Sequence, residues 1–174
     1  MPTHRLIDSP DSLTTISVAI GQWVVAAAPA KIRTLVGSCV GVVLYDRAAR
    51  LGGLAHIVLP SARGSVDHLG KYADTAIPAM IAEFNRQLGD KLRSRLTAKL
   101  VGGATMFQVD AVAQENAGLN IGQRNQEAVE LILNELTIPI LGRDVGGASG
   151  RRLTLDTTSG IVTIRAPGGV DYEL

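Results

Sequence analysis

Aromatic residues, cysteine and net charge are all scarce in this chain, and each scarcity excludes a class of function. Phe, Trp and Tyr make up 3% of the 174 residues, and the formal net charge is +1. The chain therefore offers neither the aromatic platform nor the basic stripe that nucleic-acid binding uses. A single cysteine excludes an internal disulfide, and with three scattered histidines it argues against a structural zinc site.

Long apolar runs are also missing. No run reaches the ~18 residues of a membrane-spanning helix. The first residues carry charges and prolines where a secretory signal would have an apolar block. We therefore expect a cytoplasmic protein with no membrane insertion and no nucleic-acid partner.

The composition favours one globular domain. Hydrophobic residues make up 46% of the chain, which is long enough to bury a substantial core. Residues 1–14 are polar and show no periodicity, so we expect a flexible N-terminal leader followed by a single domain over residues 15–174.

Strand-like segments outnumber helical ones. Period-two alternation and β-branched runs predict a first strand pair within residues 16–27, turning at Gly21-Gln22, and further strands at 31–36, 40–45, 51–59, 96–101, 138–141, 152–156 and 161–165. Apolar spacing of three and four predicts helices over 72–88 and 120–136, with Pro78 either kinking the first helix or lying in its first turn. Because strands and helices do not alternate regularly, we expect an α+β layered sandwich, with mixed or antiparallel sheets and two main helices packed on them.

The candidate chemistry lies in the predicted hairpin of residues 40–59. Cys39 follows a Gly37-Ser38 strand break, and the second strand of the hairpin carries His56. A thiol, an imidazole and a hydroxyl are the groups that nucleophilic acyl transfer needs. At such a break the backbone amides of Ser38 and Cys39 can point at a developing oxyanion. A small core cysteine and an interior histidine are the plainer alternatives, and the spacing alone leaves both open.

Several motifs resemble one known family in their order along the chain. They are LVGSCVGVVLYD at 35–46, GGLAHIVLP at 52–60, GKYADTA at 70–76, AKLVGGATMF at 98–107, NIGQRN at 120–125 and DVGGASGRR at 144–152. Over roughly residues 20–165 the chain is similar to the CheD family of bacterial chemotaxis proteins, whose members are chemoreceptor glutamine deamidases.

The resemblance implies a mechanism and partners. Cys39 would attack the carboxamide of a receptor glutamine, and His56 would activate the thiol in an ion pair and protonate the leaving ammonia. Water would then hydrolyse the thioester, with no metal or organic cofactor. The implied substrate is the cytoplasmic helical bundle of methyl-accepting chemoreceptors, and the implied partner is CheC, a phosphatase of the response regulator CheY. The implied fold is an α/β sandwich shared with some toxin deamidases.

The third catalytic group implied by the family is a threonine upstream of the cysteine. Thr34 is the candidate, five residues before Cys39, and Ser38 is the fallback. The hydroxyl can also lie one residue further away, where this chain has Arg33, which a strand would point to the opposite face. Turn formation and helix capping are the plainer roles for a further set of residues, which the family resemblance suggests could line the cleft: Gly102, Gly103, Ala104, Asn120, Arg124 and Asn125.

Two other functions stay open at this point. The chain could be a different cysteine acyl-transfer enzyme, such as a peptidase or a transglutaminase. It could also be a non-catalytic protein that regulates chemotaxis by binding receptors or CheC.

Overall fold

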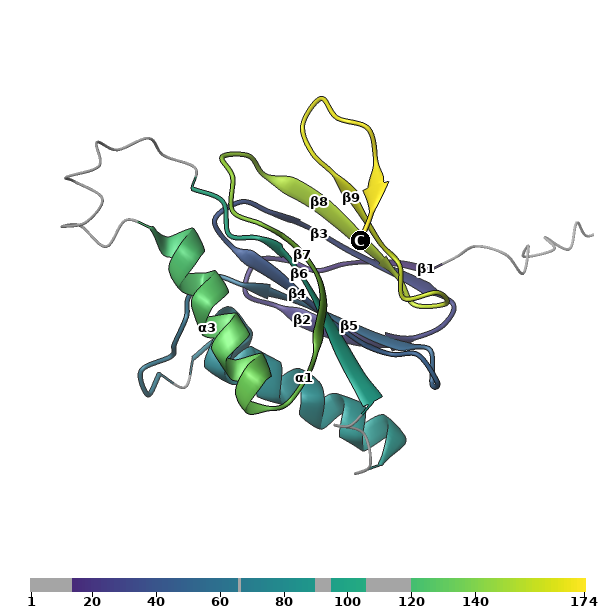
Figure 1. The fold of residues 1–174 in the computed structure, drawn as a ribbon. Helices are drawn as coiled ribbons and strands as arrows, with labels where there is room; N and C mark the ends of the chain where they lie inside the picture. Colours follow the sequence, from purple (N-terminus) through teal and green to yellow (C-terminus); the bar gives the residue numbers. More distant parts are fainter. Residues whose placement is uncertain (1–13, 66, 90–94, 106–119) are drawn as a thin grey trace, which may run out of the picture.

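Two five-stranded sheets pack face to face, and two helices cover the outer face of one of them, which gives three layers (Figure 1). The computed structural model describes residues 14–65, 67–89, 95–105 and 120–174. The architecture confirms the predicted α+β layered fold with mixed sheets. Among the described residues, no helix has the length and apolar character needed to cross a membrane.

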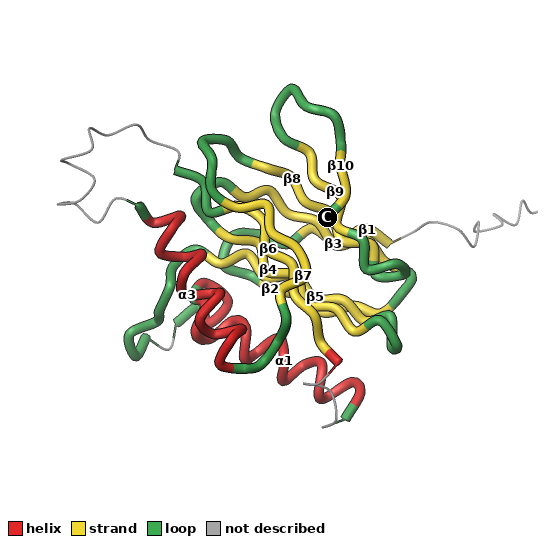
Figure 2. The backbone as a smooth tube through the Cα atoms, in the orientation of Figure 1, coloured by secondary structure: helices red, strands yellow, loops and turns green. Residues whose placement is uncertain are grey.

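Both sheets are mixed, with one parallel pair of strands each. Figure 2 shows the strands of the sheets in yellow and the helices in red. The first sheet has the order β1 (Thr14–Ser17), β3 (Ala30–Val36), β8 (Arg151–Asp156), β9 (Val162–Arg165) and β10 (Tyr172–Glu173). The second has the order β2 (Trp23–Ala27), β5 (Leu51–Ile57), β4 (Val40–Asp46), β6 (Leu96–Gly102) and β7 (Ile140–Val145). The predicted hairpins appear as the antiparallel pairs β4–β5 and β8–β9.

The prediction that the first two strands pair with each other was wrong. β1 and β2 do not pair with each other, because the chain crosses from one sheet to the other between them. Val18 N–H still donates to the Arg33 carbonyl of the first sheet at 2.9 Å, whereas the Gln22 carbonyl accepts from His56 N–H of the second sheet at 2.9 Å. Gly21, with φ of 70°, makes the turn of this crossing. Alternation in a sequence identifies a strand but not the sheet that it joins.

Other boundaries differ at the C-terminal end. β7 begins at Ile140 and continues to Val145, whereas the sequence predicted a strand over residues 138–141. β10 is two residues long and exposed, so it carries no hydrophobic pattern that a sequence could reveal.

Side chains of the strand β3 alternate between the core and solvent, as predicted. Ile32, Thr34 and Val36 are buried between the sheets, while Lys31, Arg33 and Leu35 are exposed on the outer face. Apolar side chains of both sheets fill this inter-sheet layer, among them Val43, Leu54 and Leu153. Thr34 is therefore a polar group placed inside an apolar layer, where its hydroxyl needs partners.

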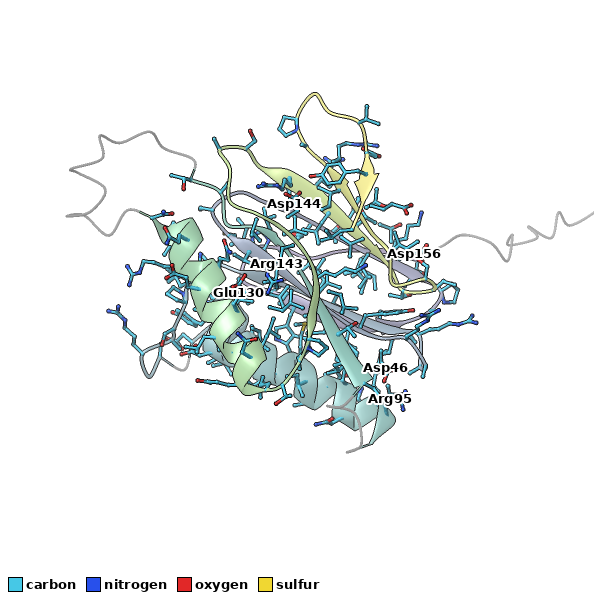
Figure 3. The ribbon with its side chains drawn as sticks, in the orientation of Figure 1. Asp46, Arg95, Glu130, Arg143, Asp144 and Asp156 are labelled. Atoms are coloured by element: carbon cyan, nitrogen blue, oxygen red, sulfur yellow. The ribbon has the colours of Figure 1, made fainter. Side chains whose placement is uncertain are left out.

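Two helices, α1 (Ala73–Leu88) and α3 (Ile121–Glu135), form the third layer. A short 3₁₀ turn, η1 (Leu69–Lys71), precedes α1. The apolar faces of the two helices bury the other side of the second sheet. Pro78 lies inside α1 on its exposed side, beyond the first turn. An ion pair of 3.0 Å between Arg143 of β7 and Glu130 ties α3 to the sheet (Figure 3).

Candidate active site

The loop Gly37–Cys39 connects the two sheets, since β3 ends at Val36 and β4 begins at Val40. Backbone amides at the end of β6 hold this loop. Ala104 N–H donates to the Gly37 carbonyl at 2.9 Å, and Gly103 N–H donates to the Cys39 carbonyl at 2.8 Å. A Cβ atom on Gly102, whose φ is 110°, would lie 2.4 Å from the Cys39 carbonyl oxygen. Glycine at this position therefore allows the close approach of the two backbones.

The Cys39 side chain is half-buried and packs against the apolar layer between the sheets. Its thiol is free. Burial disfavours the charged thiolate and raises the pKa of Cys39 above its ordinary value of 9.0. Burial therefore favours the neutral thiol form of Cys39.

His56 lies on β5, directly opposite Gly41 of β4. Its side chain is 3% exposed and projects on the same face as Leu54, into the inter-sheet layer that Cys39 also contacts. Cys39 lies in the loop two residues before Gly41, and its side chain packs against this same layer. Burial disfavours the imidazolium and lowers the pKa of His56 below its ordinary value of 6.5.

Thr34 supplies the contact that fixes the imidazole. Its Oγ1 lies 2.8 Å from His56 Nδ1 and 2.8 Å from the carbonyl oxygen of Val18. A carbonyl can only accept, so the single hydroxyl hydrogen of Thr34 goes to Val18 and the oxygen accepts from Nδ1–H. The imidazole proton is thereby assigned to Nδ1. This leaves the lone pair on Nε2, the nitrogen that is then free to act as a base.

The ion pair that the family resemblance implies stays a prediction. Among the described residues, no hydrogen bond joins the Cys39 thiol to His56. Burial raises the pKa of the thiol and lowers the pKa of the imidazole, so it favours the neutral form of each side chain.

Two backbone amides of the loop remain available. Within the described part of the chain, the N–H groups of Ser38 and Cys39 have no acceptor. The peptide bonds here are trans, so each N–H points away from the carbonyl of the preceding residue. Those carbonyls, on Gly37 and Ser38, are held by hydrogen bonds from Ala104 and Asn125. The directions of the two free N–H groups are therefore fixed by the packing around the loop.

The other candidate residues divide into two groups. Gly102, Gly103 and Ala104 touch the loop through their backbones, as described above, and Asn125 is fully buried beneath it. Asn120 instead caps α3, accepting from Gln123 N–H at 3.2 Å. Arg124 is exposed and lines a separate pocket of about 380 Å³, whose other lining residues include Pro60 and Tyr72.

Sequence reasoning missed one contributor. The Val18 carbonyl determines which way the Thr34 hydroxyl donates, and hence the tautomer of His56. A backbone carbonyl has no signal in residue type, so no sequence pattern could have identified it.

Comparison of the sequence with known proteins assigns the chain to a family. The family model described as CheD chemotactic sensory transduction matches residues 58–166. A protein of Desulforamulus reducens named "Probable chemoreceptor glutamine deamidase CheD" is 49% identical over 156 residues, which cover 88% of this chain and 91% of that protein. The chain belongs to the CheD family. This confirms the resemblance inferred from the sequence motifs.

A second CheD protein and a solved structure are also similar to this chain. "Chemoreceptor glutamine deamidase CheD" of Thermotoga maritima is 40% identical over 153 residues, covering 87% of this chain and 92% of that protein. Among solved structures, the hypothetical protein YfiH of Bacillus licheniformis is similar to this chain with a TM-score of 0.44 and 16% sequence identity. The alignment covers 70% of this chain and 49% of that chain. A likeness at that level carries no argument about function.

Proposed function

We propose that this protein is a chemoreceptor glutamine deamidase that converts glutamine side chains of its substrate to glutamate with Cys39 as the nucleophile. The observation that carries the proposal is the buried contact of 2.8 Å between Thr34 Oγ1 and His56 Nδ1. It leaves Nε2 free as a base in the same apolar layer that the only thiol of the chain contacts. The names of the CheD relatives supply the substrate class.

The reaction begins with proton transfer within this pair. His56 Nε2 takes the thiol proton as Cys39 Sγ attacks the carboxamide carbon of the glutamine side chain. The carbonyl oxygen becomes an oxyanion, which the N–H groups of Ser38 and Cys39 stabilise. Thr34 keeps the Nδ1 proton in place, so the imidazolium that forms is oriented and hydrogen-bonded.

Release and hydrolysis reverse these proton transfers. His56 gives its proton to the amide nitrogen, the C–N bond breaks and ammonia leaves, which produces a thioester between Cys39 and the substrate. Water then attacks the thioester while His56 Nε2 removes its proton. The C–S bond breaks, the proton returns to sulfur, and the side chain leaves as glutamate.

We further propose the cytoplasmic region of methyl-accepting chemoreceptors as the site of modification, the cytoplasm as the compartment of the enzyme, and CheC as a binding partner. All three follow from the resemblance to the family. The partner is tested by purifying the tagged protein from a cell extract and asking whether CheC co-purifies with it. The co-purified CheC is expected to be lost at high salt or in the presence of excess untagged protein.

The direct test of the activity uses a purified cytoplasmic receptor fragment. The wild-type protein is expected to release ammonia and to convert individual glutamine residues to glutamate, as seen by peptide mass spectrometry, while Cys39→Ala does neither. Cleavage of the receptor chain would indicate a peptidase, and incorporation of an added amine would indicate a transglutaminase. Receptor binding by the wild-type protein without any change in peptide mass would instead favour a non-catalytic regulator.

A further inference from the structure

Asn125 occupies a position in α3 where an apolar residue would be expected. It lies on the buried face of the helix together with Gly122, Val129 and Leu133, at the three-and-four spacing of a helical stripe. Asn125 has no exposed surface. It therefore lies between the helix and the second sheet and does not line the cleft, which corrects the expectation from the family motifs.

The amide of Asn125 makes two hydrogen bonds from the same nitrogen. Nδ2 donates to the Val58 carbonyl at 2.9 Å and to the Ser38 carbonyl at 3.3 Å. Both neighbours are acceptors, so the nitrogen has to face them and the orientation of the amide is determined. The side-chain oxygen, Oδ1, is buried and has no partner among the described residues.

This arrangement destabilises the fold in one respect, because a buried acceptor without a donor loses the hydrogen bonds it would make to water. An apolar residue of similar size would avoid that penalty only by removing the donor from the half-buried carbonyls of Val58 and Ser38. The contacts made by Nδ2 therefore account for an asparagine at this position, and one of them is to the loop that carries the nucleophile.

The contact with Ser38 fixes the peptide unit that ends in the Cys39 N–H. Gly103 and Ala104 hold the carbonyls of Cys39 and Gly37 with backbone amides, whereas the Ser38 carbonyl between them is held by the Asn125 side chain. In a trans peptide the Cys39 N–H points away from the Ser38 carbonyl. Pulling the carbonyl toward α3 therefore aims the Cys39 N–H away from α3, and no acceptor within the described part of the chain takes this N–H.

We propose that Asn125 is a positioning residue for the oxyanion site, acting through the Ser38–Cys39 peptide. It touches neither the substrate nor the reacting atoms. The role rests on the proposed deamidase function and adds to it the group that orients one oxyanion donor. Because the site must match a charge that develops in the transition state, Asn125 contributes mainly to kcat and little to KM.

The test compares two reactions of the same thiol. Deamidation passes through a tetrahedral oxyanion, whereas alkylation of Cys39 by iodoacetamide is a displacement at carbon with no oxyanion. In Asn125→Leu and in Asn125→Asp, which keeps the shape but removes the Nδ2 donors, kcat for a receptor fragment is expected to fall by ~10- to 10²-fold with KM nearly unchanged. The alkylation rate and its pH profile are expected to remain those of the wild-type protein.

Asn85→Leu is the matched control. Asn85 is also a helical asparagine whose side-chain oxygen is buried without a partner among the described residues, but it lies near the end of α1, and no hydrogen bond within the described part of the chain joins its side chain to the loop. We expect wild-type kcat in this variant, measured alongside thermal unfolding of all the proteins.

Three results would overturn the role of Asn125. They are an unchanged kcat in folded Asn125 variants, an equal fall in deamidation and alkylation, and failure of both Asn125 variants to fold while Asn85→Leu folds. Each would make Asn125 a structural residue only. Absence of ammonia release by the wild-type protein is a different outcome, because it contradicts the deamidase function itself.

Discussion

Replacing Thr34 with valine removes the hydroxyl that fixes His56 and preserves the shape of the side chain. Thr34 Oγ1 contacts two buried groups at 2.8 Å each, His56 Nδ1 and the Val18 carbonyl. With valine, neither group has this partner, and Nδ1 is no longer favoured as the protonated nitrogen. Leaving a buried polar group unpaired costs about 1–3 kcal/mol.

The effect on catalysis follows from that energy. If a loss of about 1–3 kcal/mol is felt in the transition state, the single-turnover rate falls by ~5- to 150-fold, since about 1.4 kcal/mol corresponds to a factor of ten. Substrate affinity should change little, because Thr34 is buried at 7% exposure. Thr34→Ser keeps the hydroxyl and should retain most of the rate.

The assay is rapid-quench deamidation of a receptor fragment by excess enzyme, with Arg33→Ala as the control. Arg33 lies on the same strand but on its exposed face, so its removal should leave the chemical step unaffected. A wild-type single-turnover rate in folded Thr34→Val would refute the role assigned to this hydroxyl. An equal loss of rate in Thr34→Ser and Thr34→Val would refute it as well.

The remaining predictions concern the two titrating groups and the loop. The rate of Cys39 alkylation should rise with pH to an inflection above 9.0, because burial raises the thiol pKa, and an inflection below neutral pH would indicate a resting ion pair. The kcat/KM profile should lose activity on the acid side only below pH 6.5, because burial lowers the pKa of His56 and keeps it neutral at that pH, and half-loss at or above 6.5 would contradict this. Gly102→Ala should destabilise the protein, measured by urea unfolding, more than Gly64→Ala, since both have positive φ but only Gly102 places the new Cβ 2.4 Å from the Cys39 carbonyl, and equal losses would argue against the close approach.

Local periodicity predicted much of the fold and part of the site. Alternation in β3 separated Thr34 from Arg33 correctly, because a pleated strand must send neighbouring side chains to opposite faces. The helix of residues 72–88 was found to within one residue, since its apolar spacing leaves little choice of buried face. The β4–β5 hairpin was predicted because a short polar turn joins two apolar runs.

Properties that depend on tertiary packing were not predictable in this way. The assignment of β1 and β2 to different sheets is one, since each strand alone shows the same alternation. The directions of the Cys39 and His56 pKa shifts are another, because they come from burial in the folded protein. Asn125 carried a weak signal, a polar residue on the apolar stripe of α3, but its partners Ser38 and Val58 lie 87 and 67 residues away in the sequence.

The central claim is that Cys39 forms a covalent thioester with the substrate, and trapping that intermediate tests it most directly. A receptor-derived glutamine peptide is mixed with excess protein, the reaction is quenched in acid during the first turnover, and the intact mass of the protein is measured. We predict an adduct equal to the peptide less ammonia, mapped to Cys39 and released by hydroxylamine, and no adduct in Cys39→Ala. Glutamate formation by Cys39→Ala at the wild-type rate would contradict the account.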